Sequence, residues 1–247
     1  MFNSIRKEVH KANFNYFDKI DSPDKAYWLG FIWADGYIAK RERKQPSGRV
    51  RIEYNLKLAL QESDASHIQK FLDCIESDYP VHFYKSKGFD RENWIEARAF
   101  ITNLHMCSLL YEDYGLIPRR SDVSSVLKQI PKEYERFFIL GIFDADGSFT
   151  TYHGNYGDKM NVVFGGSKFL LRFIENHLTT NEIILKADTD SGQRKLHQRH
   201  AGKDGAWRTL NFAGKHQCMK IINYLYKDSP IYLDRKYQKY LDLPYHN

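Results

Sequence analysis

Two aspartates lie at the ends of two similar nine-residue stretches, and this pairing has the most direct chemical meaning in the sequence. Asp35 lies in WLGFIWADG, residues 28–36, and Asp146 lies in ILGIFDADG, residues 139–147. The two acids are 111 positions apart (146 − 35), close to half of the 247-residue chain. A repeat of this size predicts two similar folding units, whose approximate symmetry axis can bring the two carboxylates together.

Paired carboxylates in this setting favour a hard divalent cation. Each acid is expected in the last turn of a helix, so two like charges would share the negative ends of two helix dipoles. Oxygen ligands suit Mg²⁺, whose charge removes that conflict. Two carboxylates and a bound metal beside a basic surface fit metal-assisted hydrolysis of phosphodiesters. We therefore expect Asp35 and Asp146 to bind Mg²⁺ and to be catalytic.

The elements that must position these acids are two helices with clear ends. Ser22 is a typical N-cap, and Pro23 suits the first helical position that follows it. Ile130 and Pro131 precede the second copy in the same way. Gly36 and Gly147 follow the acids, where we expect each to adopt the left-handed conformation that often ends a helix.

Small residues predict that these two helices pack closely. Gly30 and Ala34 are four positions apart, as are Gly141 and Ala145, so each helix has a row of small residues on one face. Such rows let two helix backbones approach closely. If the helices pack in parallel, their C-terminal ends meet and the two acids come together.

Basic residues gather after each motif and point to a polyanionic partner. The formal net charge is +6 and the isoelectric point is about 9.0. Two basic clusters favour nucleic acid over an ordinary solvated face. The expected DNA contacts are Arg41, Arg43, Arg49, Arg51, Asn55, Lys57, Arg194, Lys195, His197, Arg199 and Arg208.

Alternating polarity places the first cluster on a hairpin. Apolar residues occupy every second position from Val50 to Leu60, and polar residues such as Arg51 and Lys57 lie between them. We expect strands at 37–44, 49–61, 81–85 and 94–100 and helices at 64–76 and 103–114, with Ser63 as a helix cap. In the second half we expect strands at 149–153, 160–164, 183–186, 196–200 and 207–212, and helices at 168–178, 215–226 and 232–240.

Composition excludes several other classes of protein. Charges interrupt every apolar run, so no membrane span is expected, and the N-terminus lacks a secretion signal, which favours an intracellular protein. Three scattered cysteines are typical of reduced thiols. Counting twelve residues from Asp144 ends at Asn155, which excludes an EF-hand. His197, His200, His216 and Cys218 offer a zinc site as an alternative, although their spacing matches no standard zinc framework.

At these residues the chain resembles the LAGLIDADG homing endonucleases, in their single-chain, two-motif form. The resemblance rests on both nonapeptides, the order of elements in each half and the phrase LYKDSPIYLDRKY near the C-terminus. It implies an α+β fold of two pseudo-symmetric αββαββα repeats, with motif helices at the central interface and antiparallel saddles in the DNA major groove. It also implies Mg²⁺-dependent cleavage of both strands of a long target site, leaving 3′ overhangs.

The resemblance assigns roles to particular residues. Asp35 and Asp146 occupy the metal-ligand position, whereas Trp33 and Asp144 occupy an earlier acid position of the motif, so Asp144 is not expected to be a ligand. Arg98 matches a basic residue of the catalytic centre in the first half. In the second half the matching basic residue is Lys215 or Arg208, of which Lys215 is the stronger candidate. Asp64 and either Gly166 or Ser167 lie near polar positions that organise water.

The resemblance also predicts the domain organisation and leaves one alternative function open. An N-terminal extension (1–22) precedes the first repeat (23–120), and a linker (121–131) leads to the second repeat (132–247). Because the linker is short, the halves should pack as one body. The resemblance also implies a monomer that is encoded in an intron. The alternative is an RNA-splicing maturase or a DNA-binding protein that does not cut. Both acids are present here, which favours the nuclease.

Overall fold

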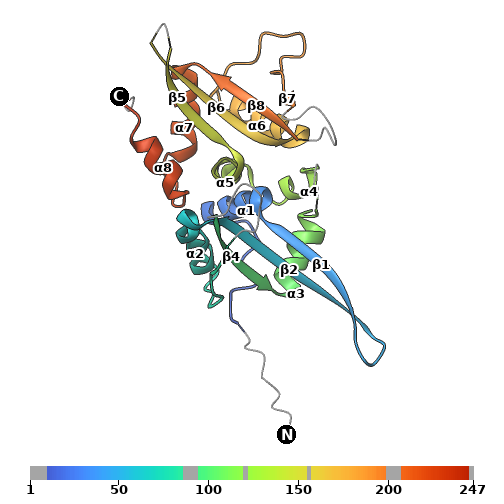
Figure 1. Cartoon of the computed structure of the whole chain (residues 1–247). Helices are drawn as coiled ribbons and strands as arrows, with labels where there is room; N and C mark the ends of the chain where they lie inside the picture. The colour runs from blue at the N-terminus through green and yellow to red at the C-terminus, as the bar shows by residue number, and fades with distance from the viewer. Residues whose placement is uncertain (1–9, 86–93, 119–121, 155–156, 199–206, 245–247) are drawn as a thin grey trace.

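Two similar halves lie on either side of a central pair of helices (Figure 1). The structure is a computed structural model that describes residues 10–85, 94–118, 122–154, 157–198 and 207–244. Within these residues, each half contains a four-stranded antiparallel sheet with helices packed against one face. The predicted α+β fold of two αββαββα repeats is confirmed.

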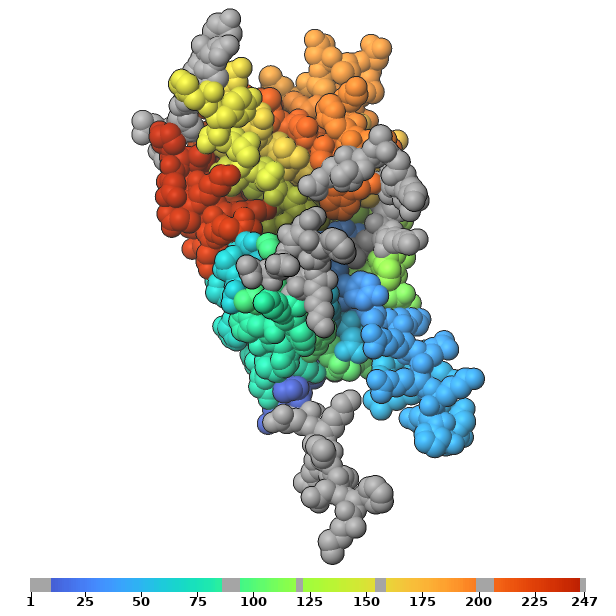
Figure 2. All heavy atoms as spheres, in the orientation of Figure 1, coloured from blue at the N-terminus to red at the C-terminus, as the bar shows by residue number. Residues whose placement is uncertain are grey.

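The first half begins with the first motif helix. In chain order its elements are α1 (Pro23–Asp35), β1 (Tyr37–Lys44), β2 (Val50–Gln61), the 3-10 helix η1 (Glu62–Asp64), α2 (Ala65–Cys74), β3 (His82–Lys85), β4 (Ile95–Thr102), α3 (Leu104–Ser108) and the π-helical segment η2 (Leu109–Asp113). The β1–β2 hairpin, in blue in Figure 2, projects well beyond the rest of this half.

The second half repeats the order after a short connection and adds one helix. The connection contains α4 (Ser124–Leu127) and the 3-10 helix η3 (Lys132–Tyr134). The second half contains α5 (Glu135–Asp146), β5 (Ser148–Gly154), β6 (Gly157–Ser167), α6 (Lys168–Thr180), β7 (His197–Gln198), β8 (Trp207–Ala213), α7 (Lys215–Tyr226) and α8 (Asp234–Leu241).

The two sheets share one topology, so positions in them can be matched. Their strand orders are β1-β2-β4-β3 and β5-β6-β8-β7. In the first sheet Ala59 of β2 pairs with Arg98 of β4, and in the second Gly165 of β6 pairs with Thr209 of β8. Because the hairpins start at equivalent residues, Arg98 and Thr209 occupy equivalent positions in the two sheets.

One apolar core runs through both halves and joins them into a single body. Trp28 and Phe31 of α1 and Phe138 and Phe143 of α5 are fully buried in it. Polar contacts also cross between the halves, including the ion pair of Arg235 with Asp64 at 3.1 Å. The expectation that the halves pack together is therefore confirmed.

Residues 183–186 form no strand, contrary to the sequence prediction. The backbone N–H groups of Ile183 and Ile184 instead donate to the carbonyl of Leu178 at the end of α6. Glu182 has φ of 58°, which turns the chain there, and Ile184 is buried as an anchor under the loop. The apolar residues of this segment therefore fix a helix end rather than pair with a strand. Ser63 likewise caps no helix, because it lies inside η1.

The glycines after the two acids are extended rather than left-handed, which corrects the predicted helix ends. Gly36 has φ −76° and ψ 148°, and Gly147 has φ −85° and ψ 171°. A Cβ at Gly36 would lie 2.4 Å from the carbonyl oxygen of Ile32, and one at Gly147 would lie 2.7 Å from that of Phe143. Glycine is needed here because the chain turns tightly against the preceding helix, not because φ is positive.

Candidate functional site

The central feature of the site is a contact between α1 and α5 that only glycine permits. A Cβ at Gly30 would lie 2.1 Å from the carbonyl oxygen of Phe138, and one at Gly141 would lie 2.1 Å from that of Tyr27. These two contacts are equivalent, because each residue of one helix matches the residue 111 positions later in the other. The predicted close packing of the small-residue faces is confirmed.

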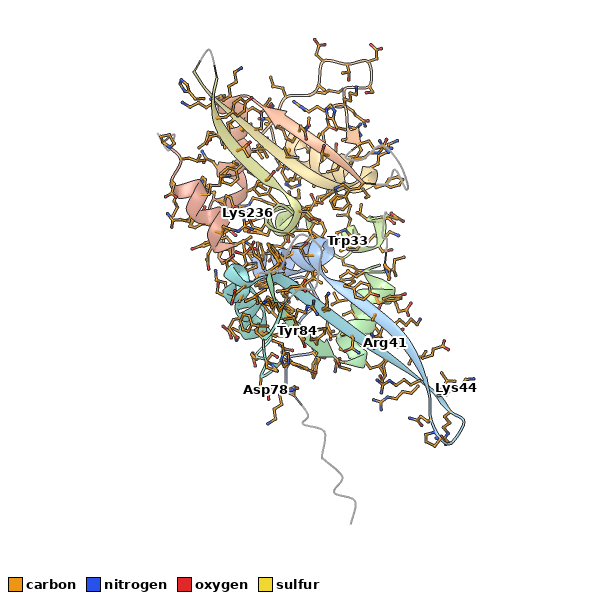
Figure 3. All side chains as sticks on the ribbon, viewed as in Figure 1. Trp33, Arg41, Lys44, Asp78, Tyr84 and Lys236 are labelled. Carbon is orange, nitrogen blue, oxygen red and sulfur yellow. The ribbon has the colours of Figure 1, made fainter. Side chains whose placement is uncertain are left out.

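Asp35 and Asp146 end these two helices and lie near one buried ammonium group. Both acids are half-buried, and both are followed directly by the outer hairpin strand of their half. Lys236 of α8, labelled in Figure 3 beside α5, is 7% exposed. Burial lowers the pKa of Lys236 to about 8, and the negative charge of Asp144, with smaller effects from Asp35 and Asp146, acts against this shift. The two motif helices are in contact at Gly30 and Gly141, five residues before Asp35 and Asp146.

Asp144 is a buried structural acid rather than part of the open site. Its carboxylate accepts hydrogen bonds from the hydroxyls of Tyr27 at 2.8 Å and Tyr226 at 2.7 Å, and from the backbone N–H of Leu233 at 2.8 Å. Burial raises the pKa of Asp144, and these donors together with nearby positive charge oppose that shift. Both of its oxygens accept hydrogen bonds that connect α5 with α1, α7 and the start of α8. This bonding agrees with the expectation that Asp144 is not a metal ligand.

The outer face of the first sheet carries the first basic cluster. Arg41 pairs with Glu53 across β1 and β2, and Arg43 pairs with Arg51, so these side chains share the face turned away from the helices. Asn55 and Lys57 lie on the same face, since Leu56 and Leu58 between them are buried. Arg49 lies in the turn before β2. Figure 3 shows Arg41 and Lys44 along the projecting hairpin.

Arg98 lies on this outer face, on the strand next to β2. Its neighbours Ala97 and Ala99 are buried on the opposite face. The guanidinium forms an ion pair with Glu96 and lies 4.5 Å from the centroid of the Tyr84 ring. The strand register places Arg98 at the level that Thr209 occupies in the second half.

The second basic cluster is divided between several locations. His197 is exposed on β7 and pairs with Thr209, while Lys195 is exposed in the loop just before it. Arg208 lies on the same face of β8 as buried Leu210, which is the side that carries the helices. Arg199 lies outside the described residues.

Arg194 has contacts of a structural kind. Its backbone N–H donates to the carboxylate of Glu175 at 2.6 Å, and its guanidinium donates to the carbonyl of Leu185 at 2.9 Å. The guanidinium also lies 5.2 Å from the centroid of the buried Phe212 ring. Through these contacts Arg194 holds the loop before β7 against α6 and the core.

The structure does not bring Lys215 next to Asp146. Lys215 begins α7, directly after Gly214, whose N–H donates to the carbonyl of Met160. A Cβ at Gly165, five residues further along β6, would lie 3.4 Å from the carbonyl oxygen of Asp146. Five residues of strand span about 16 Å, so Lys215 starts from the far end of β6.

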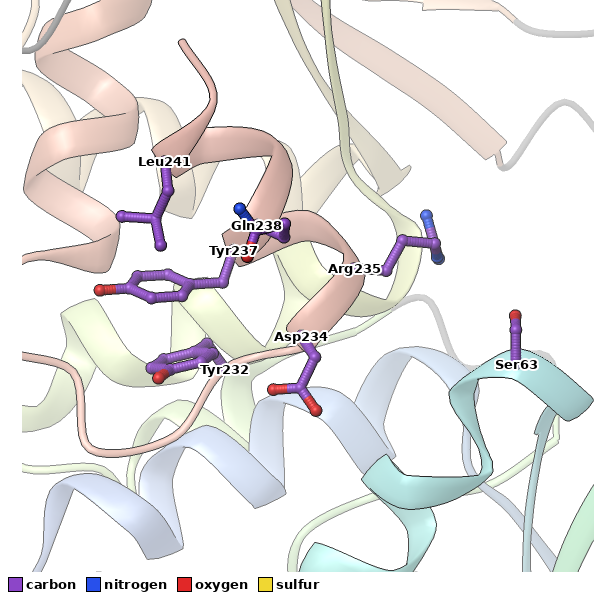
Figure 4. A pocket seen from close by; sticks show the side chains of 7 residues that line it. All are labelled: Ser63, Tyr232, Asp234, Arg235, Tyr237, Gln238 and Leu241. Atoms are coloured by element: carbon purple, nitrogen blue, oxygen red, sulfur yellow. The ribbon is translucent and has the colours of Figure 1, made fainter.

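The polar residues expected to organise water occupy two different environments. Asp64 is buried and accepts hydrogen bonds from Arg235 of α8 at 3.1 Å and from Gln61 at 2.9 Å. Figure 4 shows Arg235 extending from α8 toward the turn that holds Ser63. In the second half, Ser167 ends β6 and caps α6 by accepting from the N–H of Leu170. Gly166, with φ of 157°, lies just before it.

The acids at the helix ends fit a hard cation that takes further ligands from outside the protein. Within the described ranges, no group of three or more His, Cys, Asp or Glu side chains could hold a metal alone. Mg²⁺ commonly uses one or two carboxylates and completes its shell with water and substrate phosphates. Two half-buried aspartates match that requirement. The zinc alternative gains no support, since buried Cys218 donates to the carbonyl of Met160 and His200 lies outside the described residues.

Lys236 and the buried tyrosines are functional candidates that motif matching missed. Leu233, Lys236 and Tyr240 follow helical spacing, so Lys236 lies in the otherwise apolar stripe of α8. A lysine in an apolar stripe is a signal for a buried cation with a specific partner. Tyr27 and Tyr226 carry no comparable signal, because aromatic residues in apolar helices are ordinary core residues.

Comparison with solved structures identifies the fold. The chain is similar to the LAGLIDADG homing endonuclease I-GzeII in complex with a DNA target, with 11% identity, 90% of this chain and 88% of that chain covered, and a TM-score of 0.56. It is also similar to I-LtrWI bound to target DNA, with 10% identity, 93% and 89% coverage and a TM-score of 0.55. I-SmaMI bound to cleaved DNA matches with 13% identity, 91% and 88% coverage and a TM-score of 0.56.

These likenesses define the class of fold. The chain has the LAGLIDADG homing endonuclease fold over about nine tenths of its length. No protein-family model and no curated protein sequence matches it. None of the helices in the described parts of the chain is long and apolar enough to cross a membrane.

Proposed function

We propose that this protein is a homing endonuclease of the LAGLIDADG family that cuts both strands of a specific DNA site with Mg²⁺ and leaves 3′ overhangs. The observation that carries the proposal is the close packing of α1 against α5 at Gly30 and Gly141, in two helices that each end in one of the repeated acids, Asp35 and Asp146. The fold and the two flanking sheets with outward polar faces support it. The similar structures named above contain DNA.

Each part of the molecule has a task in this proposal. The outer faces of the two sheets contact the major groove on either side of the cut, with Arg41, Arg43 and Arg51 neutralising phosphates or reading bases. The α1–α5 pair fixes the spacing of the two acids, and so the spacing of the two phosphates that are cut. The chain acts as a monomer, since both acids belong to one body.

Asp35 and Asp146 would hold the metal. When bound there, Mg²⁺ would supply Lewis-acid activation of the phosphate and a more acidic bound water. The half-burial of both carboxylates limits bulk water around them, which strengthens their attraction for a cation. Arg98, on the outer face at this level of the first sheet, would stabilise negative charge on the phosphate that is cut.

Selection and cleavage of a DNA library tests this function. Wild-type protein is incubated with random duplexes and Mg²⁺, and fragments are sequenced for a shared cut site and for overhang polarity. Asp35→Asn and Asp146→Asn should each lower the cleavage rate by 10²-fold or more, on the order expected for loss of a metal ligand or charge stabiliser. Asp73→Asn, an exposed acid on α2, is the matched control and should cut normally. Tight, specific binding without any cut would favour the non-cleaving alternative.

A further inference from the structure

Lys236 has contacts that connect it to Asp146 through the backbone. Its ammonium donates to the carbonyl oxygens of Phe143 and Gly147, each at 2.6 Å. These two carbonyls lie on either side of Asp146 in the chain. A side chain that holds both therefore fixes the last turn of α5 and the residue that follows it.

Lys236 needs these two hydrogen bonds because its ammonium group is buried. The side chain is buried, and its ammonium lies 5.3 Å from the centroid of the Phe143 ring. A buried ammonium is costly unless its donors are satisfied, so the carbonyls at the C-terminal end of α5 serve as its necessary partners. The position of the helix end and the position of the ammonium therefore depend on each other.

Both halves of the molecule hold the helix that carries Lys236. Lys70 of α2 forms an ion pair with Asp234 at 2.5 Å, and Asp64 accepts from Arg235. On the other side, Lys239 donates to the carbonyl of Phe149 at 2.5 Å. Because α8 contacts both halves, the position of Lys236 depends on how the two motif helices are placed relative to each other.

The two sheets carry different residues at equivalent positions, so the two half-sites differ chemically. Arg98 lies on the outer face of the first sheet, whereas the equivalent position in the second sheet is Thr209. Lys215, the basic residue expected for the second half, starts from the far end of β6. Among the described residues, α8 places the basic residue Lys236 on the Asp146 side, where it donates to the carbonyls of Phe143 and Gly147.

We propose that Lys236 is the positioning residue of the second half-site, which holds Asp146 in the place where it can share a divalent cation with Asp35. This inference rests on the proposed nuclease function. Lys236 acts through the backbone on either side of Asp146 and does not touch substrate. Its removal should loosen the last turn of α5 and affect the strand cut on the Asp146 side more than the other strand.

Divalent-cation binding separates a positioning role from a simple charge effect. Free Mn²⁺ is measured by electron paramagnetic resonance during titration of wild type, Lys236→Met and Lys239→Met. Lys239→Met is a matched control, because it removes one lysine–carbonyl bond from the same helix. Loss of a positioning residue should weaken Mn²⁺ binding by about tenfold or more, as for other residues that orient metal ligands. Unchanged or tighter binding, as removal of a competing positive charge would give, would overturn the proposal.

Strand-resolved cleavage provides the second readout. A duplex with different labels on its two strands gives two single-turnover rates, and Asp146→Asn identifies which strand depends on Asp146. In Lys236→Met the rate on that strand should fall about tenfold further than the other, and in Lys239→Met the ratio should stay within about twofold. Equal loss on both strands would contradict the positioning role. The ratio is independent of the folded fraction, so a general folding defect cannot imitate it.

The two proposals fail in different ways. A wild-type protein that binds Mn²⁺ but cuts no duplex would remove the nuclease function, and the Mn²⁺ comparison alone would then decide the role of Lys236. If Lys236→Met yields no folded protein by circular dichroism, Lys236→Gln is carried through the same titration. Gln retains a neutral donor on a shorter side chain, and it should also weaken Mn²⁺ binding; wild-type affinity in this variant would overturn the proposal.

Discussion

At the scale of single residues, similar chemical groups have different roles because their surroundings differ. Asp144 and Asp146 are two positions apart, but Asp144 is buried and bonded by Tyr27 and Tyr226, whereas Asp146 is half-buried at a helix end. His67 extends the same buried chain, since its Nε2 lies 2.9 Å from the Tyr27 hydroxyl. With Tyr27 donating to Asp144, His67 must donate to Tyr27 from Nε2, and burial, which lowers the pKa of the ring, favours its neutral form.

The neutral state of His67 predicts a loss of stability in acid. Burial, with a smaller effect from the charge of Lys70, lowers the pKa of His67 to about 3 from 6.5. Between these two pKa values the unfolded chain binds one more proton than the folded chain. The contribution of His67 to the free energy of unfolding is therefore fully present above pH 6.5 and is lost as the pH falls toward 3. Between pH 7 and pH 5 wild type should lose about 2 kcal/mol of unfolding free energy more than His67→Gln. Urea denaturation at both pH values measures this, and parallel losses in the two proteins would contradict it.

At the scale of elements, the packing of α1 against α5 determines where the two acids lie. The helices touch through their backbones at Gly30 and Gly141, and each turns directly into a strand after its acid. The distance between the acids is therefore set by glycines that lie five positions before them. Larger side chains would separate the helices and, with them, the two halves of the site.

Gly141→Ala tests this dependence. The added Cβ would lie 2.1 Å from the Tyr27 carbonyl oxygen and 2.7 Å from the Phe31 nitrogen, both in the backbone of α1. Overpacking against backbone should cost about 3 kcal/mol or more of unfolding free energy, at the upper end for such changes. Gly48→Ala is the control: its Cβ meets nothing within 4 Å, and only its φ of 80° resists the change, at about 1 kcal/mol. Equal costs by urea denaturation would exclude a tight helix contact.

Local patterns in the sequence predicted the regular elements well, and the reasons for the failures are physical. Strict alternation located β2, and the caps at Ser22 and Pro23 located α1. The strand predicted at residues 183–186 was wrong, because apolar residues can hold a loop against the core as well as form a strand. Of the site, the duplicated acids could be found from the sequence alone. Lys236 is marked only by its place in the apolar stripe of α8, and its partners could not be predicted, because they are carbonyl groups, which every residue carries and no sequence pattern marks.

At the scale of the whole molecule, a four-stranded sheet lies on either side of the α1–α5 pair (Figure 1). Outward residues alternate with buried ones near the core, at Ile38 of β1 and from Tyr54 to Leu58 of β2, whereas both faces of the hairpin are exposed further out. Arg41, Arg43 and Arg51 lie on the outward face, whereas Lys40 lies on the other face and pairs with Glu112 at 2.7 Å. This arrangement predicts which charges contribute to DNA binding.

Salt dependence of DNA affinity distinguishes the two faces of the hairpin. Each phosphate neutralised adds about 0.9 to the slope of log affinity against log salt concentration. Replacing Arg41, Arg43 and Arg51 together by Gln should lower that slope by about 2 to 3. Lys40→Gln should leave it unchanged, because this lysine lies on the opposite face of the hairpin from the three arginines. Fluorescence anisotropy at several salt concentrations measures both, and equal slopes in the two variants would place the DNA elsewhere.

The central claim is that Asp35 and Asp146 together hold the metal at the ends of α1 and α5. Anomalous scattering from Mn²⁺ in crystals of the protein with its selected DNA site tests it most directly. We predict manganese peaks bonded to carboxylate oxygens of Asp35 and Asp146, at about the 2 Å typical of such bonds. Manganese bound only elsewhere, with these two carboxylates free of metal beside bound DNA, would contradict the account.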